Sequence, residues 1–168
     1  LVKDVNKLSS VFHEAFTIAQ NGRPGPVLID IPKDVQFASG TYEEKNKIVI
    51  PSHRLFEPSP DFEKNKIEEA VELISKAKKP IFYIGGGCIN SGPKASKLVR
   101  EFINIVGSPV TMTLMGLGVV ASSDKNSLGM LGMHGMYEAN MAMHECDVMI
   151  NIGARFDDRV TGRLDAFS

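Results

Sequence analysis

The sequence predicts an α/β fold in which a parallel β-sheet is covered by helices on both faces. Three apolar runs, at residues 80–84, 109–114 and 147–152, have the length of buried strands. Amphipathic segments with helical spacing alternate with these runs. Because strands that alternate with helices build parallel sheets, we expect the three strands to run in one direction.

Four segments carry the apolar spacing of helices. The first runs from Asp4, a residue type that caps helices, to about Gln20. The second begins near Asp61 and presents an apolar stripe along one face. The third ends at Gly107, a residue type common after the last helical turn, and the fourth covers residues 136–145. These helices supply the expected covering layers.

Two segments lie outside this alternation. Residues 27–31, Val-Leu-Ile-Asp-Ile, form a short apolar run that we expect to be a buried parallel strand ended by Pro32. Residues 37–62 combine proline, serine, glutamate and lysine without any apolar period, which is typical of a linker that crosses a surface. Within this linker, residues 48–50 are expected to form a short extended piece.

Composition and charge exclude several functions. The 168-residue chain has a net charge of −1, which argues against a nucleic-acid partner. The sequence contains no apolar run of about 18 residues and no visible signal peptide, so we expect no membrane association. Two distant cysteines, Cys88 and Cys146, favour buried free thiols over a disulfide and hence a reducing, cytoplasmic location.

Because the chain opens with Leu1 inside a helix and stops at Ser168 without a terminating signal, we expect a piece of a longer protein, with N-terminal processing as the alternative.

Glycines follow the ends of the predicted strands. They stand at 85–87, at 116 and 118, and at 153. Ligands of open parallel sheets bind beyond the carboxyl ends of the strands, and glycines let the backbone approach a ligand closely. The pattern favours a nucleotide or dinucleotide. The run Gly85-Gly86-Gly87 is not GxGxxG, however, and glycines needed only for tight turns are the alternative.

The segment from Met130 to Arg163 is the most informative part of the chain. Glycines recur every third residue at 129, 132 and 135 around His134, just before a predicted helix. This spacing favours either backbone donors aimed at an anion or a loop that needs positive φ angles. A lone histidine is more often structural than catalytic, and no second ligand or nucleophile accompanies it. We therefore predict neither a metal site nor a catalytic triad.

Methionines and charges add two further features. All eight methionines lie between Met112 and Met149, where they either fill a core or line a cofactor or substrate tunnel. Charged residues crowd the loop after the last predicted strand. They indicate either a solvated turn or a site where arginine binds phosphate and aspartate holds a ribose hydroxyl. These residues are Arg155, Asp157, Asp158, Arg159 and Arg163.

Three motifs resemble one enzyme family. They are RPGPVLIDIPKDV at 23–35, MLGMHGMYEANMAM at 130–143 and GARFDDRVTGRL at 153–164. The first is shared widely among thiamine-diphosphate enzymes, whereas the other two are much narrower. Together they resemble the catalytic large subunit of acetohydroxyacid synthase, also called acetolactate synthase. The resemblance follows nearly the whole chain in order.

The resemblance implies a domain organisation. Residues 1–36 are similar to the end of the family's first, pyrimidine-binding domain, and contribute a helix and a strand. Residues 37–62 correspond to the linker. Residues 63–168 are similar to most of the central domain, a Rossmann-like parallel sheet that binds FAD, truncated at its C-terminus. We expect residues 1–36 to pack weakly, or onto a neighbouring chain, because they lack the rest of their own sheet.

The resemblance also implies the residues that contact FAD and substrate. The FAD contacts come from the linker, from the end of the second predicted strand and from three loops. They are Arg54, Gly86, Thr113, Leu114, Leu131, Gly132, Met133, His134, Gly153, Ala154, Arg155, Phe156 and Asp157. Four residues match positions that line the family's substrate channel and herbicide site, namely Met133, His134, Asp158 and Arg159.

The family's reaction requires more than this chain contains. With thiamine diphosphate and Mg²⁺, the family decarboxylates pyruvate and condenses the product with a second 2-keto acid, pyruvate or 2-ketobutyrate. The resulting acetolactate or acetohydroxybutyrate serves the biosynthesis of valine, leucine and isoleucine. The family's catalytic glutamate and its GDG…N motif are not among these residues, so we assign no catalytic or metal-binding residue here and expect the chain to be inactive alone. The resemblance implies a homodimer or tetramer of the full enzyme and a possible separate regulatory subunit.

Two other functions remain open from the sequence. One is a related FAD- and thiamine-dependent enzyme of the pyruvate oxidase or glyoxylate carboligase type, which the narrow GARFDDRVTGRL motif disfavours. The other is a non-catalytic nucleotide-binding module used in regulation or assembly. That module would bind an adenine nucleotide as tightly as it binds FAD.

Overall fold

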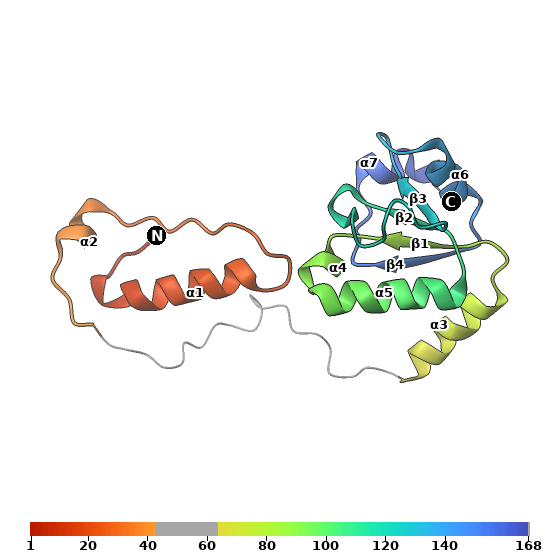
Figure 1. Ribbon diagram of the computed structural model, residues 1–168. Coiled ribbons are helices and arrows are strands. Elements are labelled where there is room, and N and C mark those ends of the chain that lie inside the picture. Colours follow the sequence, from red (N-terminus) through yellow and green to blue (C-terminus); the bar gives the residue numbers. More distant parts are fainter. Residues whose placement is uncertain (43–63, 168) are drawn as a thin grey trace. The chain divides into compact units, whose positions relative to one another are not determined.

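The chain divides into two compact units, Leu1–Phe62 and Glu63–Ser168. The computed structural model describes residues 1–42 and 64–167 (Figure 1). The extended piece expected at 48–50 and the linker arginine, Arg54, lie outside the described residues.

The first unit contains the predicted N-terminal helix. A 3₁₀ turn, η1 (Val5–Lys7), leads into α1 (Leu8–Gln20). The Asp4 carboxylate accepts a hydrogen bond from the Asn6 N–H at 3.0 Å, so Asp4 caps this segment as predicted. A short helix, α2 (Lys33–Phe37), follows Pro32 and was not predicted.

The strand predicted at residues 27–31 is wrong. No strand is assigned to these residues, and Leu28 is 91% exposed. The Val2 N–H donates to the Asp30 carbonyl oxygen at 2.8 Å, which ties the extended segment back to the N-terminus. An apolar run becomes a parallel strand only when neighbouring strands pair with it, and the described part of this unit holds no sheet for it to join.

The second unit is built on a four-stranded parallel sheet in the order β3-β2-β1-β4. Three of its strands coincide with the predicted apolar runs. The fourth, β3, was missed because its short sequence, Ser-Leu-Gly-Met, has neither an apolar run nor β-branched residues. The strands are β1 (Pro80–Ile84), β2 (Val110–Met112), β3 (Ser127–Met130) and β4 (Val148–Ile152).

Three predicted helices of this unit are confirmed, and two short ones are new. The confirmed helices are α3 (Lys64–Lys76), α5 (Pro93–Val106) and α6 (Tyr137–Glu145). The helices α4 (Gly87–Asn90) and α7 (Asp158–Thr161) occupy segments that the sequence predicted as loops. Two 3₁₀ turns, η3 (Leu114–Gly116) and η4 (Leu164–Ala166), complete the element order.

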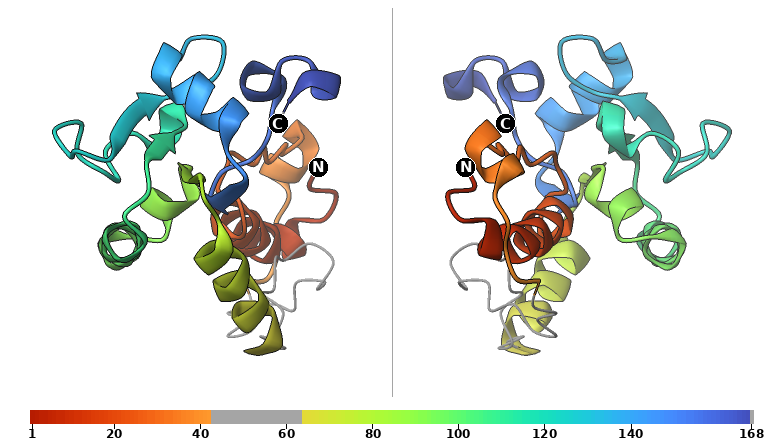
Figure 2. Two further views of the ribbon diagram at one scale, coloured as in Figure 1. Left: turned by 90° about the vertical axis from the view of Figure 1, so that its right-hand side faces the viewer. Right: turned by 90° about the vertical axis from the view of Figure 1, so that its left-hand side faces the viewer.

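Helices cover both faces of the sheet, so the predicted fold class is confirmed. Phe82 and Ile84 of β1 pack on one face, in the core formed with α5, and Phe102 of α5 meets Phe82 edge-on at 5.1 Å between ring centroids. Tyr83 points to the other face, in a second core that includes Met143 of α6. Both views of Figure 2 place α5 and α6 on opposite sides of the sheet.

The apolar stripe of α3 is largely exposed, with Ile67 at 45% and Val71 at 59%. Within residues 1–42 and 64–167, no helix combines the length and hydropathy that crossing a bilayer requires.

Cys88 is a buried thiol, as expected, whereas Cys146 is only half-buried. Burial raises the pKa of the Cys88 thiol.

Candidate functional site

The loop after β1 packs directly against the loop after β4. The Gly85 N–H donates to the Ile152 carbonyl at 2.9 Å, and the Gly87 N–H donates to the Gly153 carbonyl at 3.0 Å. A Cβ atom added at Gly85 would lie 2.2 Å from the Gly153 carbonyl oxygen. The backbones of the first loop (85–87) and the fourth loop (153–157) therefore approach each other too closely for any larger residue. Packing within the protein is enough to require glycine here, whether or not a ligand binds.

The second loop (113–118) lies beside the first. The Thr113 N–H donates to the Ile84 carbonyl at 2.9 Å, and the Thr113 hydroxyl accepts the Gly116 N–H at 3.0 Å. A Cβ at Gly86 would stand 2.9 Å from the Met115 Cβ. The side chains of Leu114 and Met115 themselves remain 68% and 74% exposed. The second loop thus presents apolar side chains next to the Gly86 backbone.

The third loop (131–135) starts level with the second, because Met130 pairs with Met112 in the sheet. Leu131 is buried, whereas Met133 and His134 are exposed. Gly132 has a φ of +94°. The glycine spacing suggested either backbone donors aimed at an anion or a loop that needs positive φ angles. The second of these is confirmed at Gly132.

An asparagine of α6 holds the third loop. The Gly132 N–H donates to the Asn140 Oδ1 at 2.7 Å, and the Asn140 Nδ2 donates to the Gly132 carbonyl at 3.0 Å. Sequence reasoning did not single out Asn140. A signal was available, because asparagine is unfavourable inside a helix unless its side chain finds a local partner.

The third and fourth loops are joined at Arg159. The Met133 N–H donates to the Arg159 carbonyl at 2.8 Å, and the Arg159 Nη1 lies 3.9 Å from the Met133 Sδ. Two of the four residues predicted to line a substrate channel are therefore in contact. His134, next to Met133, and Asp158, the first residue of α7, are both exposed.

The charged segment after β4 is partly helical, which corrects the loop predicted there. The Asp157 carboxylate accepts the Arg159 N–H at 3.1 Å and caps α7, so Asp158 and Arg159 lie in the first turn of a helix. The same carboxylate lies 3.3 Å from the Arg155 guanidinium, whose side chain remains 67% exposed. Asp157 thus holds Arg155 in place at the carboxyl end of β4.

Asn151 shapes the start of the fourth loop. The Ala154 N–H donates to the Asn151 Oδ1 at 3.2 Å, and the Asn151 Nδ2 donates to the Ala154 carbonyl at 3.1 Å. This residue is the fourth of the five residues of β4. Its bonds to Ala154 repeat the bonding of Asn140 to Gly132 in the neighbouring loop.

Tyr83 of β1 supports the fourth loop. The sequence analysis did not single out this residue. Its phenol donates to the Arg155 carbonyl at 3.1 Å, and its ring lies 5.5 Å from that of Phe156. Burial, reinforced by the nearby Asp157 carboxylate and opposed by Arg155, raises the pKa of Tyr83 to about 12. A tyrosine in an otherwise apolar buried strand must find a partner for its hydroxyl, and this was the signal available in the sequence.

Apolar and cationic side chains share the carboxyl edge of the sheet. Met112 and Met143 are buried in the cores, which confirms the core-filling role for these two methionines, whereas Met115, Met133 and Met136 are exposed. Exposed guanidinium groups suit phosphates, and exposed apolar groups suit flat rings, so the residues present fit a dinucleotide. The exposed apolar residues are Leu114, Met115, Met133, Met136, Tyr137 and Phe156, and the exposed arginines are Arg155 and Arg159.

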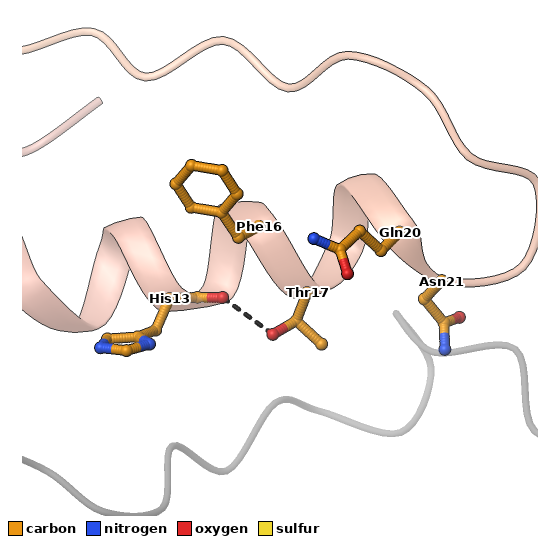
Figure 3. Close-up of a pocket in the computed structure, with 5 residues that line it drawn as sticks. All are labelled: His13, Phe16, Thr17, Gln20 and Asn21. Atoms are coloured by element: carbon orange, nitrogen blue, oxygen red, sulfur yellow. Dashed lines mark hydrogen bonds between the residues drawn. The ribbon is translucent and has the colours of Figure 1, made fainter.

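Neither of two concave regions forms a nucleotide site at this edge. A cavity of about 90 Å³ lies behind the third loop, among residues that include Leu131, Asn140 and Val160, and it is too small for a nucleotide. A hollow of about 320 Å³ is lined by His13, Phe16, Thr17, Gln20 and Asn21 (Figure 3). All five come from α1 and the residue after it, so this hollow belongs to the first unit.

Comparison with known proteins identifies the family. Residues 67–168 match the family model described as the central domain of thiamine pyrophosphate enzymes. The chain belongs to this family. The match covers more than half of the chain and includes the sheet and all four strand-end loops described above.

Individual relatives narrow this assignment. The whole chain is 44% identical to the chloroplastic acetolactate synthase of Arabidopsis thaliana, of which it covers 24%. It is 45% identical to the acetolactate synthase isozyme 2 large subunit of Escherichia coli, covering 29%, and 44% identical to the acetolactate synthase large subunit of Porphyra purpurea, covering 28%. The resemblance read from the sequence motifs is therefore confirmed. The chain spans about a quarter of the length of these curated relatives.

Proposed function

We propose that this chain is part of an acetolactate synthase that decarboxylates pyruvate and condenses the product with a second 2-keto acid, pyruvate or 2-ketobutyrate. The products, acetolactate and acetohydroxybutyrate, would enter the biosynthesis of valine, leucine and isoleucine. The observation that carries the proposal is the identity of about 44% along the whole chain to acetolactate synthases of separate origins. Such an identity, without gaps in coverage, favours a shared reaction over a shared fold alone.

The carboxyl edge of the second unit is proposed to bind FAD. The support is the donor set at this edge, where Arg155 is held by Asp157 beside exposed apolar side chains of the second and third loops. Arg155 would bind the diphosphate, and the four loops would supply backbone and apolar contacts to the rings. The full proposed set is Arg54, Gly86, Thr113, Leu114, Leu131, Gly132, Met133, His134, Gly153, Ala154, Arg155, Phe156 and Asp157. Bound FAD would supply a redox-active ring, but the proposed reaction involves no net oxidation, so we assign it a structural role.

A substrate channel is proposed to run past the third loop and α7. It would be lined by Met133, His134, Asp158 and Arg159. Support comes from the contact between the Arg159 guanidinium and the Met133 sulfur, at 3.9 Å, and from the exposure of all four side chains. A guanidinium beside an apolar thioether suits a small 2-keto acid. The guanidinium would bind the carboxylate, and the thioether would contact the alkyl group.

The remaining machinery is proposed to lie outside these residues. Thiamine diphosphate and Mg²⁺ would be bound by other parts of the complete protein, and no catalytic residue or metal ligand is assigned here. The isolated chain should therefore make no acetolactate. We propose residues 1–36 as the end of the pyrimidine-binding domain, 37–62 as linker and 63–168 as the FAD-binding domain. The unit boundary near residue 62 and the family match from residue 67 support the start of the last of these domains.

Assembly and location complete the proposal. We propose a homodimer or tetramer of the complete enzyme, with a possible regulatory subunit, and neither nucleic acid nor membrane as a partner. The thiols Cys88 and Cys146 suit a reducing compartment, which supports a cytoplasmic location.

The test is a turnover assay on the complete gene product. With thiamine diphosphate, Mg²⁺ and FAD, it should convert pyruvate to CO₂ and acetolactate, detected as acetoin after acid treatment. Hydrogen peroxide formation with oxygen uptake would instead indicate a pyruvate oxidase, and turnover of glyoxylate alone a glyoxylate carboligase. Binding of AMP as tight as that of FAD, without turnover of any 2-keto acid, would point to a non-catalytic nucleotide-binding module.

A further inference from the structure

Two asparagines make the same pair of bonds to neighbouring loops. The Asn140 amide bonds to both backbone groups of Gly132, at 2.7 Å and 3.0 Å. The Asn151 amide bonds to both backbone groups of Ala154, at 3.2 Å and 3.1 Å. A side-chain amide carries one acceptor and donors in the geometry of a peptide group, so each asparagine replaces the strand partner that the loop residue lacks.

The loops held in this way are conformationally demanding. Gly132 adopts a φ of +94°, a conformation that glycine permits but does not by itself enforce. Ala154 follows Gly153, whose φ is +69°. A glycine segment loses much conformational entropy when it becomes ordered, and two hydrogen bonds to a neighbouring side chain offset that cost before any ligand arrives.

Both bonded residues adjoin groups that face the carboxyl edge. Met133 follows Gly132 and bonds through its N–H to the Arg159 carbonyl at 2.8 Å. Arg155 follows Ala154, and its carbonyl accepts the Tyr83 phenol at 3.1 Å. A change in either asparagine would therefore be felt one residue away, at Met133 or at Arg155.

We propose that Asn140 and Asn151 are positioning residues that hold the third and fourth loops in the shape that binds a flavin dinucleotide. The inference rests on the proposed FAD function of this edge. Neither side chain is proposed to touch the flavin. Each acts through the backbone of the residue it bonds, by reducing the number of loop conformations that binding must select.

The experiment compares flavin binding by variants of the complete gene product. Asn140→Ala and Asn151→Ala remove both bonds of one pair, whereas Asn140→Asp keeps the acceptor for the Gly132 N–H and removes the donor to its carbonyl. Asn104→Ala, at an exposed position of α5, is the matched control. The FAD dissociation constant is measured by titration well below the thermal midpoint of each variant, together with the visible absorption spectrum of the bound flavin.

We expect both alanine variants to bind FAD roughly ten- to thirtyfold more weakly, because two hydrogen bonds that favour the bound loop are lost. Asn140→Asp should weaken binding by a smaller or equal factor, with an altered flavin spectrum, and Asn104→Ala should match the wild type. Circular dichroism establishes that each variant is folded at the temperature of titration. If the alanine variants have lower thermal midpoints but unchanged FAD affinity and spectrum, the asparagines are merely structural and the inference is overturned.

The two proposals can fail separately. A wild-type gene product that does not bind FAD would overturn the proposed cofactor and, with it, this inference. Tight FAD binding by the wild type with equal affinity in Asn140→Ala and Asn151→Ala would leave the cofactor proposal intact and overturn only the positioning role.

Discussion

The backbone N–H of Met133 donates to the carbonyl oxygen of Arg159 at 2.8 Å. These residues are 26 positions apart in the sequence, and the bond joins the third strand-end loop to α7. It leaves no space between the two backbones, because a Cβ added at Gly132 would lie 2.6 Å from the same Arg159 oxygen. The shape of the carboxyl edge thus depends on a glycine at the point where the two segments meet.

Gly132→Ala should destabilise the chain by about 2 kcal/mol or more, because a non-glycine residue at positive φ costs roughly 1–3 kcal/mol and the added methyl group also meets a backbone oxygen. The measurement is urea unfolding followed by circular dichroism. Gly118→Ala is the matched control, since Gly118 has a similar φ of +98° but open space around its Cβ position. Equal destabilisation by both variants would mean that contact with Arg159 contributes nothing.

Tyr83→Phe should lower the unfolding free energy at neutral pH by about 1 kcal/mol, because the Arg155 carbonyl loses the hydrogen bond from the buried Tyr83 hydroxyl. Urea unfolding of the two proteins at pH 7 gives this difference. The variant keeps the ring that packs beside Phe156, so the loss reports on the hydroxyl alone.

The contribution of Tyr83 should also depend on pH. Its pKa is raised from 10.0 to about 12 in the folded protein, so the unfolded chain loses the phenol proton first. The associated stability is fully present below pH 10 and is lost as pH rises toward 12. The stability difference between wild type and Tyr83→Phe should therefore shrink over this interval. A constant difference across it would contradict the raised pKa.

The sequence predicted the sheet better than it predicted the surroundings of the loops. β1, with Phe82, Tyr83 and Ile84 fully buried, reads as a strand because both faces of a parallel sheet demand apolar residues. β3 was missed because Ser127 and Gly129 depend on pairing with β2 rather than on their own propensity. The strand predicted at residues 27–31 was wrong for the opposite reason. These residues have a strong β-strand propensity, but no strand in the described residues pairs with them.

Adjacency of the candidate residues could be predicted, but the bonds that hold them could not. Strand ends of a parallel sheet meet at one edge, so Gly86, Gly132 and Arg155 were expected to lie there. The roles of Asn140 and Tyr83 depend on side chains that reach across from α6 and β1 to particular carbonyl groups. Spacing in the sequence does not specify such contacts, whereas the polar character of each residue in its helix or strand indicated that some partner was needed.

Asp147 should stabilise the opposite, amino edge of the sheet, and the effect should disappear in acid. Its carboxylate accepts the Lys78 N–H at 2.7 Å and the Lys79 N–H at 2.9 Å, just before β4. These two bonds lower the pKa of Asp147 below its ordinary value of 3.8. The associated stability is present above pH 3.8 and is lost as pH falls through the lower pKa of the folded state.

Asp147→Asn should therefore unfold at a lower urea concentration than the wild type near pH 6, because an amide offers only one acceptor oxygen to two donors. The gap between the two proteins should narrow as pH falls below 3.8. Glu101→Gln, at an exposed position of α5, serves as the control and should give a midpoint near that of the wild type at both pH values. A gap that persists undiminished in acid would argue that the carboxylate charge is not responsible.

Hydrogen exchange should separate the two apolar runs that look alike in the sequence. The amides of residues 27–31 should exchange rapidly in this chain, because Leu28 is 91% exposed and the segment forms no strand. The amides of Phe82 and Ile84 should exchange slowly, since β1 is paired on both sides and buried. Mass spectrometry after proteolysis resolves the two segments in one experiment. Strong protection of residues 27–31 in a monomer would contradict the expectation that they pack weakly, and protection only on self-association would show that a neighbouring chain supplies the missing strand partner.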